Sequence, residues 1–274
     1  MTQPKYSITF ACYNQVKYTQ QCVDSMVRHG LNLNNLIVVD NGSIDDTRRY
    51  LQTLPLGGCI FNNQNLGCGV AWNQGALTQQ AEWTIIMNND VVVSANWVDN
   101  LINVAIANNL KVISPALVEG EFDYDFDTFA NKASVNLKNV IRIGHCHAVC
   151  LAIHKSVWME VGYFQPVPKL LGYEDTMFFH ELDKAGIAYG MTGGSWLHHF
   201  GSITQNAMKQ ERGLAQKDGL AYRYNYKLLQ QGFIKRKLNK YQRNQRLKHW
   251  RDEEFKQFSQ SIHGLRKDGQ FKWV

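Results

Sequence analysis

The sequence has no apolar run of the length that a membrane-spanning helix requires. Such a helix needs roughly 20 consecutive apolar residues, and no stretch of the 274 residues approaches that length. The first residues, Met1 to Lys5, also lack the apolar core of a secretory signal peptide. We therefore expect a cytoplasmic protein, with any contact to a membrane being peripheral and at the inner face.

The chain also has little of what a disulfide-stabilised or zinc-binding protein needs. Its six cysteines are scattered and include no Cys-x-x-Cys pair, so we expect neither a disulfide framework nor a common zinc site. In contrast, 45% of the residues are hydrophobic and 12% are aromatic. This composition is sufficient for one large domain with a sizeable core and an appendage.

Acidic residues are missing from one long segment near the C-terminus. Between Tyr222 and Arg251 there are ten lysines and arginines and no acid, whereas the rest of the chain has 19 basic and 23 acidic residues. Aromatic residues interleave with the basic ones, which indicates helices with a cationic face. Such a segment is either a solvated appendage or a surface that attracts anionic lipid headgroups. Alternatively, the basic and aromatic residues of this segment bind nucleic acid, which is a function of a different class.

What the sequence does contain is an alternation of short apolar runs and helical patterns, which predicts an α/β fold with a mainly parallel central sheet flanked by helices. The expected strands are 6–11, 36–39, 59–61, 83–87, 112–116 (closed by Pro115) and 144–153. The expected helices are 19–29, a short helix that carries 48–51 after a cap at Asp45 or Asp46, 70–80, 94–108, 155–161 and 176–185. The segment 119–139 has the composition of a loop or small hairpin. Because each strand ends in a polar turn, these turns should gather at one edge of the sheet, where ligands bind in open α/β sheets.

The most informative stretch is the apolar run from Trp83 to Met87, which ends in Asn88, Asn89 and Asp90. A strand that is covered on both faces is continuously apolar, so this run predicts a buried strand with three oxygen-bearing side chains at its carboxyl end. A carboxylate such as Asp90 suits Mg²⁺ or Mn²⁺, and such a cation can neutralise a diphosphate. Taken alone, the triplet is better explained as a plain polar turn after a strand, and only the other motifs of the chain favour a metal site.

Two common phosphate-binding patterns are absent from the polar turns. Gly67-Cys68-Gly69 lacks the third glycine of the dinucleotide fingerprint, although its backbone amides and Asn65 can approach a phosphate or sugar at the start of the next helix. Cys12-Tyr13-Asn14, after the first strand, is neither glycine-rich nor basic. A sugar nucleotidyltransferase usually has a glycine-rich, basic loop at this place for its triphosphate. A nucleotidyltransferase activity is therefore possible but less favoured by the sequence.

Seven motifs follow one another in an order that matches a known family. They are Phe10-Ala11-Cys12-Tyr13-Asn14, Val38-Val39-Asp40-Asn41-Gly42-Ser43, Asn65-Leu66-Gly67, Asn88-Asn89-Asp90, Val161-Gly162-Tyr163-Phe164, Gly172-Tyr173-Glu174-Asp175 and His198-His199-Phe200-Gly201-Ser202. In this order they resemble the family 2 glycosyltransferases of the GT-A fold, especially bacterial rhamnosyltransferase-like members, over about residues 5–204. The resemblance implies a catalytic domain at 1–215, and the basic helical extension then occupies 216–274.

The resemblance also implies a donor site. Ala11 and Tyr13 would line a nucleobase pocket, and Asp40 would accept a hydrogen bond from the N3–H of a pyrimidine, which uracil and thymine offer and cytosine does not. Further contacts to the nucleotide sugar are expected from Asn65, Gly67, Asn88 and Asn89. The metal motif departs from the family because Asn88 replaces its first carboxylate. Asp90 is therefore the expected direct ligand of Mn²⁺ or Mg²⁺, together with His198 or His199, and Ser202 lies near for a phosphate oxygen.

Glu174 and Asp175 match the acidic pair from which inverting members take their general base, and we expect Asp175 to be that base. Without the resemblance, the pair could simply complement the dipole of the following helix. The expected function is an inverting, metal-dependent transfer of a sugar from UDP or dTDP to an acceptor hydroxyl in bacterial surface glycan synthesis, such as O-antigen or capsule. The acceptor is a glycan or a lipid-linked glycan. No nucleic acid partner is expected, because the polar strand ends lie in the net acidic part of the chain.

Overall fold

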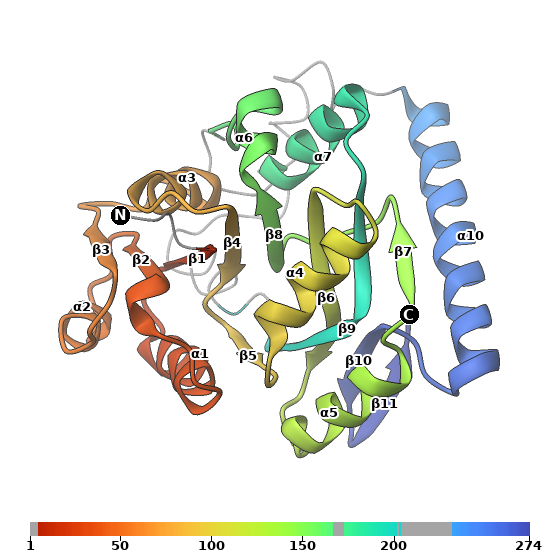
Figure 1. Ribbon diagram of the computed structural model, residues 1–274, viewed down its shortest axis with the longest axis horizontal. Helices are drawn as coiled ribbons and strands as arrows, with labels where there is room; N and C mark the ends of the chain where they lie inside the picture. Colours follow the sequence, from red (N-terminus) through yellow and green to blue (C-terminus); the bar gives the residue numbers. More distant parts are fainter. Residues whose placement is uncertain (1–4, 167–172, 202, 204–231) are drawn as a thin grey trace.

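The computed structural model describes residues 5–166, 173–201, 203 and 232–274, in which helices cover both faces of one mixed sheet (Figure 1). The first half of the chain is a regular α/β unit in which all expected elements form. It comprises β1 (Tyr6–Cys12), α1 (Val16–Arg28), the short 3₁₀ helix η1 (Leu33–Asn35), β2 (Leu36–Asp40), α2 (Thr47–Leu51), β3 (Gly58–Phe61), α3 (Cys68–Thr78) and β4 (Trp83–Asn88). Strands β3, β2, β1 and β4 are neighbours in that order and all pair in parallel.

The second half of the chain makes the sheet mixed. It comprises β5 (Val91–Val93), α4 (Trp97–Ala107), β6 (Val112–Gly120), α5 (Phe126–Asn136), β7 (Ile141–Ile143), β8 (Cys150–His154), α6 (Lys155–Val161), α7 (Glu174–Ala185), β9 (Tyr189–His199), α10 (Phe233–Phe258), β10 (His263–Lys267) and β11 (Gln270–Trp273). Strand β8 lies antiparallel between β4 and β6, whereas β9 and β10 run parallel to β6. The α/β fold expected from the sequence is confirmed, with this mixed half in addition to the parallel one.

Three local expectations were wrong. Pro115 does not close its strand, because the β6–β9 pairing shifts register between Pro115 and Ala116 and the strand continues to Gly120. A proline lacks the amide hydrogen of a regular ladder, and such an irregularity accommodates it. The segment 119–139 contains helix α5, whose N-cap Asp125 accepts a hydrogen bond from the Thr128 amide at 3.0 Å. Of the expected strand 144–153, only the end from Cys150 is in β8.

The sheet separates two apolar cores. Residues of α1, α4 and α5 pack against one face, and Trp72 of α3, Val157 of α6 and Phe178 of α7 pack against the other. In β4, Ile85 and Met87 belong to the first core and Ile86 belongs to the second. The continuously apolar run of β4 is therefore buried on both faces, as the sequence predicts, and this holds the polar residues after it in a fixed place.

The C-terminal part of the described chain joins the sheet through β10 and β11, which the sequence analysis did not anticipate. Strand β10 pairs with the end of β6, and α10 stands along the side of the molecule (Figure 1). The fully buried Arg142 of β7 forms a bidentate ion pair with Glu254 of α10, with Nε–Oε1 and Nη2–Oε2 distances of 2.8 and 2.9 Å. Among the described helices, none is both long enough and apolar enough to cross a bilayer.

Candidate active site

The end of β4 presents its three polar side chains in alternating directions. Asn88 and Asp90 point to one side, where both approach the ring of His199: Asn88 Nδ2 lies 3.4 Å and Asp90 Oδ1 lies 3.3 Å from Nε2. Asn89 points the other way and donates a hydrogen bond from Nδ2 to Thr19 Oγ1 at 2.9 Å. Of the sequence-predicted triplet, the structure thus brings Asn88 and Asp90 to the site and turns Asn89 toward α1.

The two adjacent histidines at the end of β9 also face opposite sides, because successive strand residues alternate. His199 points at Asp90, whereas Nδ1 of His198 lies 3.0 Å from the Tyr124 hydroxyl and Nε2 lies 3.2 Å from the carbonyl oxygen of Gly120. Burial lowers the pKa of His198 to about 4. The structure therefore brings His199 to Asp90 and places His198 among aromatic side chains.

Two residues that the sequence analysis missed hold His199 in place. Glu119 of β6 contacts Nδ1 of His199 through Oε1 at 3.2 Å, and its Oε2 lies 3.1 Å from Nε2 of His263 in β10. Burial alone would lower the pKa of His199, but its hydrogen bonds to Asp90 and Glu119 outweigh burial and raise the pKa to about 9. The same bonds from His199 and His263 hold the pKa of Glu119 well below its usual value. The order His263, Glu119, His199, Asp90 thus forms one continuous chain of polar contacts, which we call the histidine relay.

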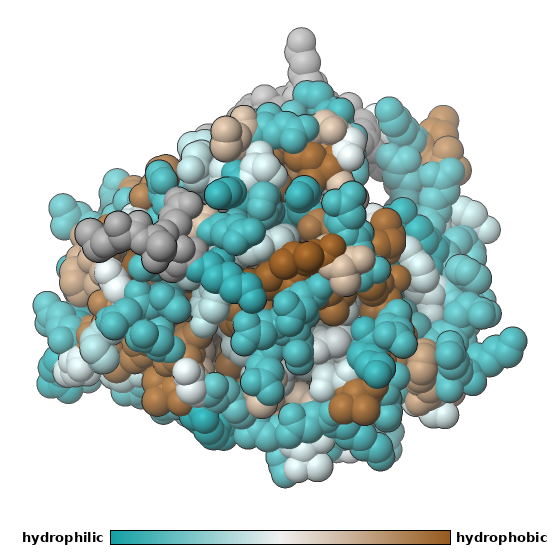
Figure 2. Space-filling view, in the orientation of Figure 1, coloured by the Kyte–Doolittle hydropathy of each residue, from teal (hydrophilic) through white to brown (hydrophobic). Residues whose placement is uncertain are grey.

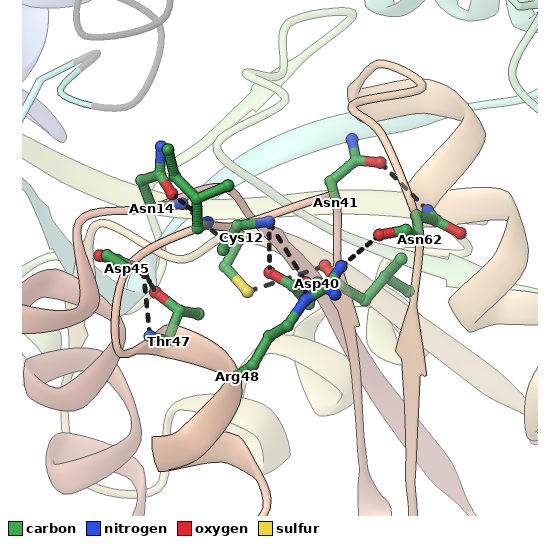
Figure 3. Close-up of polar contacts among 11 residues, drawn as sticks. Cys12, Asn14, Asp40, Asn41, Asp45, Thr47, Arg48 and Asn62 are labelled. Atoms are coloured by element: carbon green, nitrogen blue, oxygen red, sulfur yellow. Dashed lines mark hydrogen bonds and ion pairs between the residues drawn. The ribbon is translucent and has the colours of Figure 1, made fainter.

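On the other side of the site, the ends of β1 and β2 form a polar turn around Asp40 (Figure 3). Asp40 is fully buried, and its carboxylate accepts hydrogen bonds from the amide of Ser43 at 3.1 Å and from Arg48 Nε at 2.6 Å. Arg48 also donates to the carbonyl oxygen of Asn62 and lies over the ring of Phe61. The predicted base-recognition carboxylate is therefore engaged within the protein.

Asn41 fixes the loop that carries Asn65 and Gly67. Its Nδ2 donates to Asn65 Oδ1 at 3.0 Å and to the carbonyl oxygen of Gly67 at 3.2 Å, and its Oδ1 accepts from the amide of Leu66 at 3.0 Å. The loop also passes so close to Gly42 that an added Cβ would lie 2.8 Å from a backbone carbon of Gln64. Asn41 has no predicted binding role; its contacts explain how the β3–α3 loop is positioned next to β2.

The remaining nucleotide candidates lie on the same edge. Ala11, near the end of β1, is the cross-strand partner of Asn88 in β4 and of Val39 in β2. Ala11 and Tyr13 are both partly exposed, as residues that line a pocket must be. Ser202, the expected phosphate contact, lies outside the described residues, as does the part of the basic segment before residue 232.

The acidic pair begins helix α7 and packs against the start of α3. An added Cβ on Gly69 would lie 3.2 Å from Cβ of Glu174, so the two helix ends are in direct contact. Burial, and to a smaller extent the charge of Asp175, raises the pKa of Glu174 to about 7. Asp175 accepts a hydrogen bond from the amide of Thr176 at 2.7 Å.

One thiol shows that the acidic pair and Asp90 share the same region. The pKa of Cys68, at the start of α3, is raised well above its usual value by burial and by the negative charges of Glu174, Asp90 and Asp175, in that order. Residues that are far apart in the sequence, in the turn after β4 and at the starts of α3 and α7, therefore lie near one another at the sheet edge.

The side chains at the end of β4 have the chemistry for a divalent cation but do not enclose one. Asp90 supplies a carboxylate oxygen and Asn88 an amide oxygen, and His199 supplies an imidazole nitrogen once a cation displaces the proton that its raised pKa favours. This donor set suits Mn²⁺ and less well Mg²⁺. No group of three acidic, histidine or cysteine side chains in the described part of the chain could hold a metal ion alone. The residues fit a cation that is completed by ligands from outside the protein, as the oxygens of a diphosphate would be.

The sequence pattern of the family described as "Glycosyl transferase family 2" matches residues 7–160, more than half of the chain. An uncharacterized glycosyltransferase of Rickettsia felis is 25% identical over 187 residues, which cover 62% of this chain and 30% of that protein. One of Rickettsia bellii is 28% identical over 184 residues, which cover 62% of this chain and 26% of that protein. The matched part of the chain thus spans less than a third of the length of these relatives.

A solved structure shows the same fold. The crystal structure of GalNAc-T7 with UDP, GalNAc and Mn²⁺ superposes with a TM-score of 0.57 at 13% sequence identity, and the match covers 72% of this chain and 44% of that one. At this identity the likeness concerns the fold alone. From the sequence match over β1 to α6 and the arrangement of the sheet, we conclude that the chain belongs to the glycosyl transferase family 2 and has the GT-A fold.

Proposed function

We propose that the chain transfers a sugar from a UDP- or dTDP-sugar to an acceptor hydroxyl, with inversion at the anomeric carbon and with the help of Mn²⁺ or Mg²⁺. The observation that carries this proposal is the convergence of Asp90, Asn88 and His199 with the acidic pair around the start of α3. Cation ligands and a candidate base thus lie on one edge of the sheet, beside the loops after β1, β2 and β3. A sugar held between them would have its leaving group at Asp90 and its acceptor at α7.

In this reaction Asp175 takes the proton of the acceptor hydroxyl while the hydroxyl oxygen attacks the anomeric carbon. The bond from that carbon to the diphosphate breaks on the opposite face, which inverts the configuration. A divalent cation, when bound, would neutralise the negative charge of the departing diphosphate. Asp90 and His199 would hold this cation, and Glu119 fixes the ring of His199, because a ligating histidine is normally oriented through its second nitrogen. His198 faces away from this position and is not part of the proposed metal site.

For the donor, we propose that the nucleobase lies near Ala11 and Tyr13 and that Asn65 and Gly67 contact the nucleotide. Asp40 has no exposed surface, so a pyrimidine N3–H can reach its carboxylate only after a local movement. Arg48 is the group that can move, since its side chain is 38% exposed while that of Asp40 is fully buried. Binding of a uracil or thymine base would then replace one of the contacts of Arg48.

We further propose that the acceptor is a glycan or lipid-linked glycan of a bacterial surface polymer. Support comes from the uncharacterized glycosyltransferases of Rickettsia, which are bacterial proteins. The GalNAc-T7 crystal contains UDP and Mn²⁺. This supports the proposal that the present chain uses a nucleotide sugar as its donor and a divalent cation as its cofactor. The rhamnosyltransferase-like character rests on the motif resemblance.

The test is a thermal-shift series with UDP and with dTDP, each in Mn²⁺ and in EDTA. We expect the nucleotide to raise Tm more with Mn²⁺, because the side chains at the end of β4 cannot neutralise a diphosphate alone. Asp90→Asn and His199→Gln should remove the Mn²⁺ dependence, whereas the neighbouring His198→Gln should retain it. Equal stabilisation in EDTA, or a loss confined to His198→Gln, would contradict the proposed metal site.

A further inference from the structure

Helix α10 carries an exposed apolar stripe. Ile234, Leu238 and Tyr241 are 81%, 52% and 62% exposed, and their spacing of four and three residues places them on one side of the helix. Figure 2 shows the helix at the right edge of the molecule as a mostly hydrophilic surface with hydrophobic atoms near its upper end. Large apolar side chains at helical spacing normally pack against a partner, so this stripe needs an explanation.

The stripe faces away from the body of the protein. Glu254 is the buried residue of α10 that binds Arg142, and Leu247 and Trp250 are half-buried on the same side. At roughly 100° per residue, Glu254 lies roughly 200° around the helix from Ile234. The protein body therefore covers the side of α10 that is opposite the stripe.

Basic residues border the stripe on both sides. Lys235 lies on one flank and Lys248 on the other, both exposed, and the helix has no acidic residue before Asp252. We propose that this outward face of α10 docks on an anionic lipid bilayer, with Ile234, Leu238 and Tyr241 in the headgroup boundary and the lysines at the lipid phosphates. An apolar stripe with basic flanks and a tyrosine is the pattern of helices that lie in a membrane interface. A second copy of the chain is a poor occupant, since two such faces would bring like charges together.

Docking concerns where the protein binds and not the transfer reaction, so it can be tested separately from the proposed function. The full-length protein is mixed with sucrose-loaded vesicles of phosphatidylcholine, with or without phosphatidylglycerol, and centrifuged. We expect it to sediment with the phosphatidylglycerol vesicles and to be released by salt, because salt screens the attraction. Replacing Ile234 and Leu238 together by glutamine should weaken binding at least tenfold, since burial of a leucine or isoleucine contributes more than that.

A second variant, Lys235→Gln with Lys248→Gln, should weaken binding by roughly 25-fold, since each basic residue near an anionic surface contributes roughly fivefold. The matched controls are Val135→Gln with Met159→Gln, which are 68% and 87% exposed, and Lys132→Gln with Lys138→Gln, which are exposed on and after α5. Both control pairs should bind vesicles like the unmodified protein, and all variants should keep the nucleotide-induced rise in Tm.

Three outcomes would overturn the proposal. The first is no preference for phosphatidylglycerol vesicles, and the second is tight binding to a single-stranded oligonucleotide in its place. The third is that the variant Ile234→Gln with Leu238→Gln has a clearly lower Tm than the unmodified protein and binds no vesicles. This result would show that the stripe packs within the protein. A normal nucleotide response in that variant would confine the failure to docking and leave the transfer proposal intact.

Discussion

The acidic pair at the start of α7 gives the sharpest test of the proposed reaction, because its two members differ in their surroundings. If Asp175 is the general base, Asp175→Asn keeps the shape of the side chain but cannot take the acceptor proton. Transfer should then fall by about 10² to 10⁴-fold, while the affinity for the nucleoside diphosphate changes little. This pattern is typical of a group that acts in the transition state and not in donor binding.

The structure sets the expected size of the matching change, Glu174→Gln. Burial raises the pKa of Glu174 to about 7, so at pH 7 about half of the molecules carry a neutral Glu174 and at pH 5 only about 1% carry its carboxylate. Glutamine resembles the neutral form in shape. If the charge of Glu174 is not needed, Glu174→Gln should change transfer at pH 7 by no more than about twofold.

The assay is the pH dependence of kcat/KM for the unmodified protein and both variants, with nucleotide affinity measured separately by calorimetry. A Glu174 base would make the rate fall about tenfold for each pH unit below 7, because only the ionised form accepts a proton. Near-normal transfer by Asp175→Asn would end its assignment. A collapse confined to Glu174→Gln, together with that acid limb near pH 7, would move the base by one residue.

The other predictions concern the C-terminal contacts. Glu254→Gln should lower the free energy of unfolding by about 3–5 kcal/mol in urea denaturation, because it leaves the buried Arg142 guanidinium without a counter-charge. The control Glu181→Gln breaks the exposed ion pair with Lys184 and should lower the free energy of unfolding by under about 1 kcal/mol. Equal losses in the two variants would refute the role of burial. Glu119→Gln should weaken Mn²⁺ binding in the presence of UDP by about 10- to 100-fold in calorimetry. His263→Gln should have a smaller effect in the same direction, and unchanged affinity in both variants would remove the relay from the metal site.

The parallel half of the fold could be predicted from the sequence because its signals are local. The run from Trp83 to Met87 is apolar on both faces, and each strand from β1 to β4 ends in a polar turn. Helix α6 has the predicted bounds, Lys155–Val161, and ends at Gly162, which has a positive φ of 79°. Helix α5 was missed because its buried residues include only one large one, Phe126, with Ala130 and Ala133, so its apolar period is weak.

Which side chains meet at the candidate site could be predicted only in part, and their roles stay predictions. Motif order indicated Asp90, Asn88 and the late histidines, but it could not choose between His198 and His199, because that choice depends on which strand residue faces β4. Glu119 had no signal at all, since it lies in a stretch that resembles a loop in composition. The ion pair between Asp40 and Arg48 depends on a side-chain contact between the end of β2 and α2, which the sequence spacing does not reveal.

The histidine relay joins β10 to the candidate site, and the Arg142–Glu254 pair joins α10 to strand β7. Strand β10 contributes His263 to the contact with Glu119, and Ser261 Oγ accepts a further hydrogen bond from Arg142 Nη2 at 2.8 Å. Both contacts join residues on the two sides of the boundary predicted at residue 215, so the described residues of the two segments pack together. A protein that docks α10 on a membrane would thereby be linked through β10 to the ligands at the end of β4.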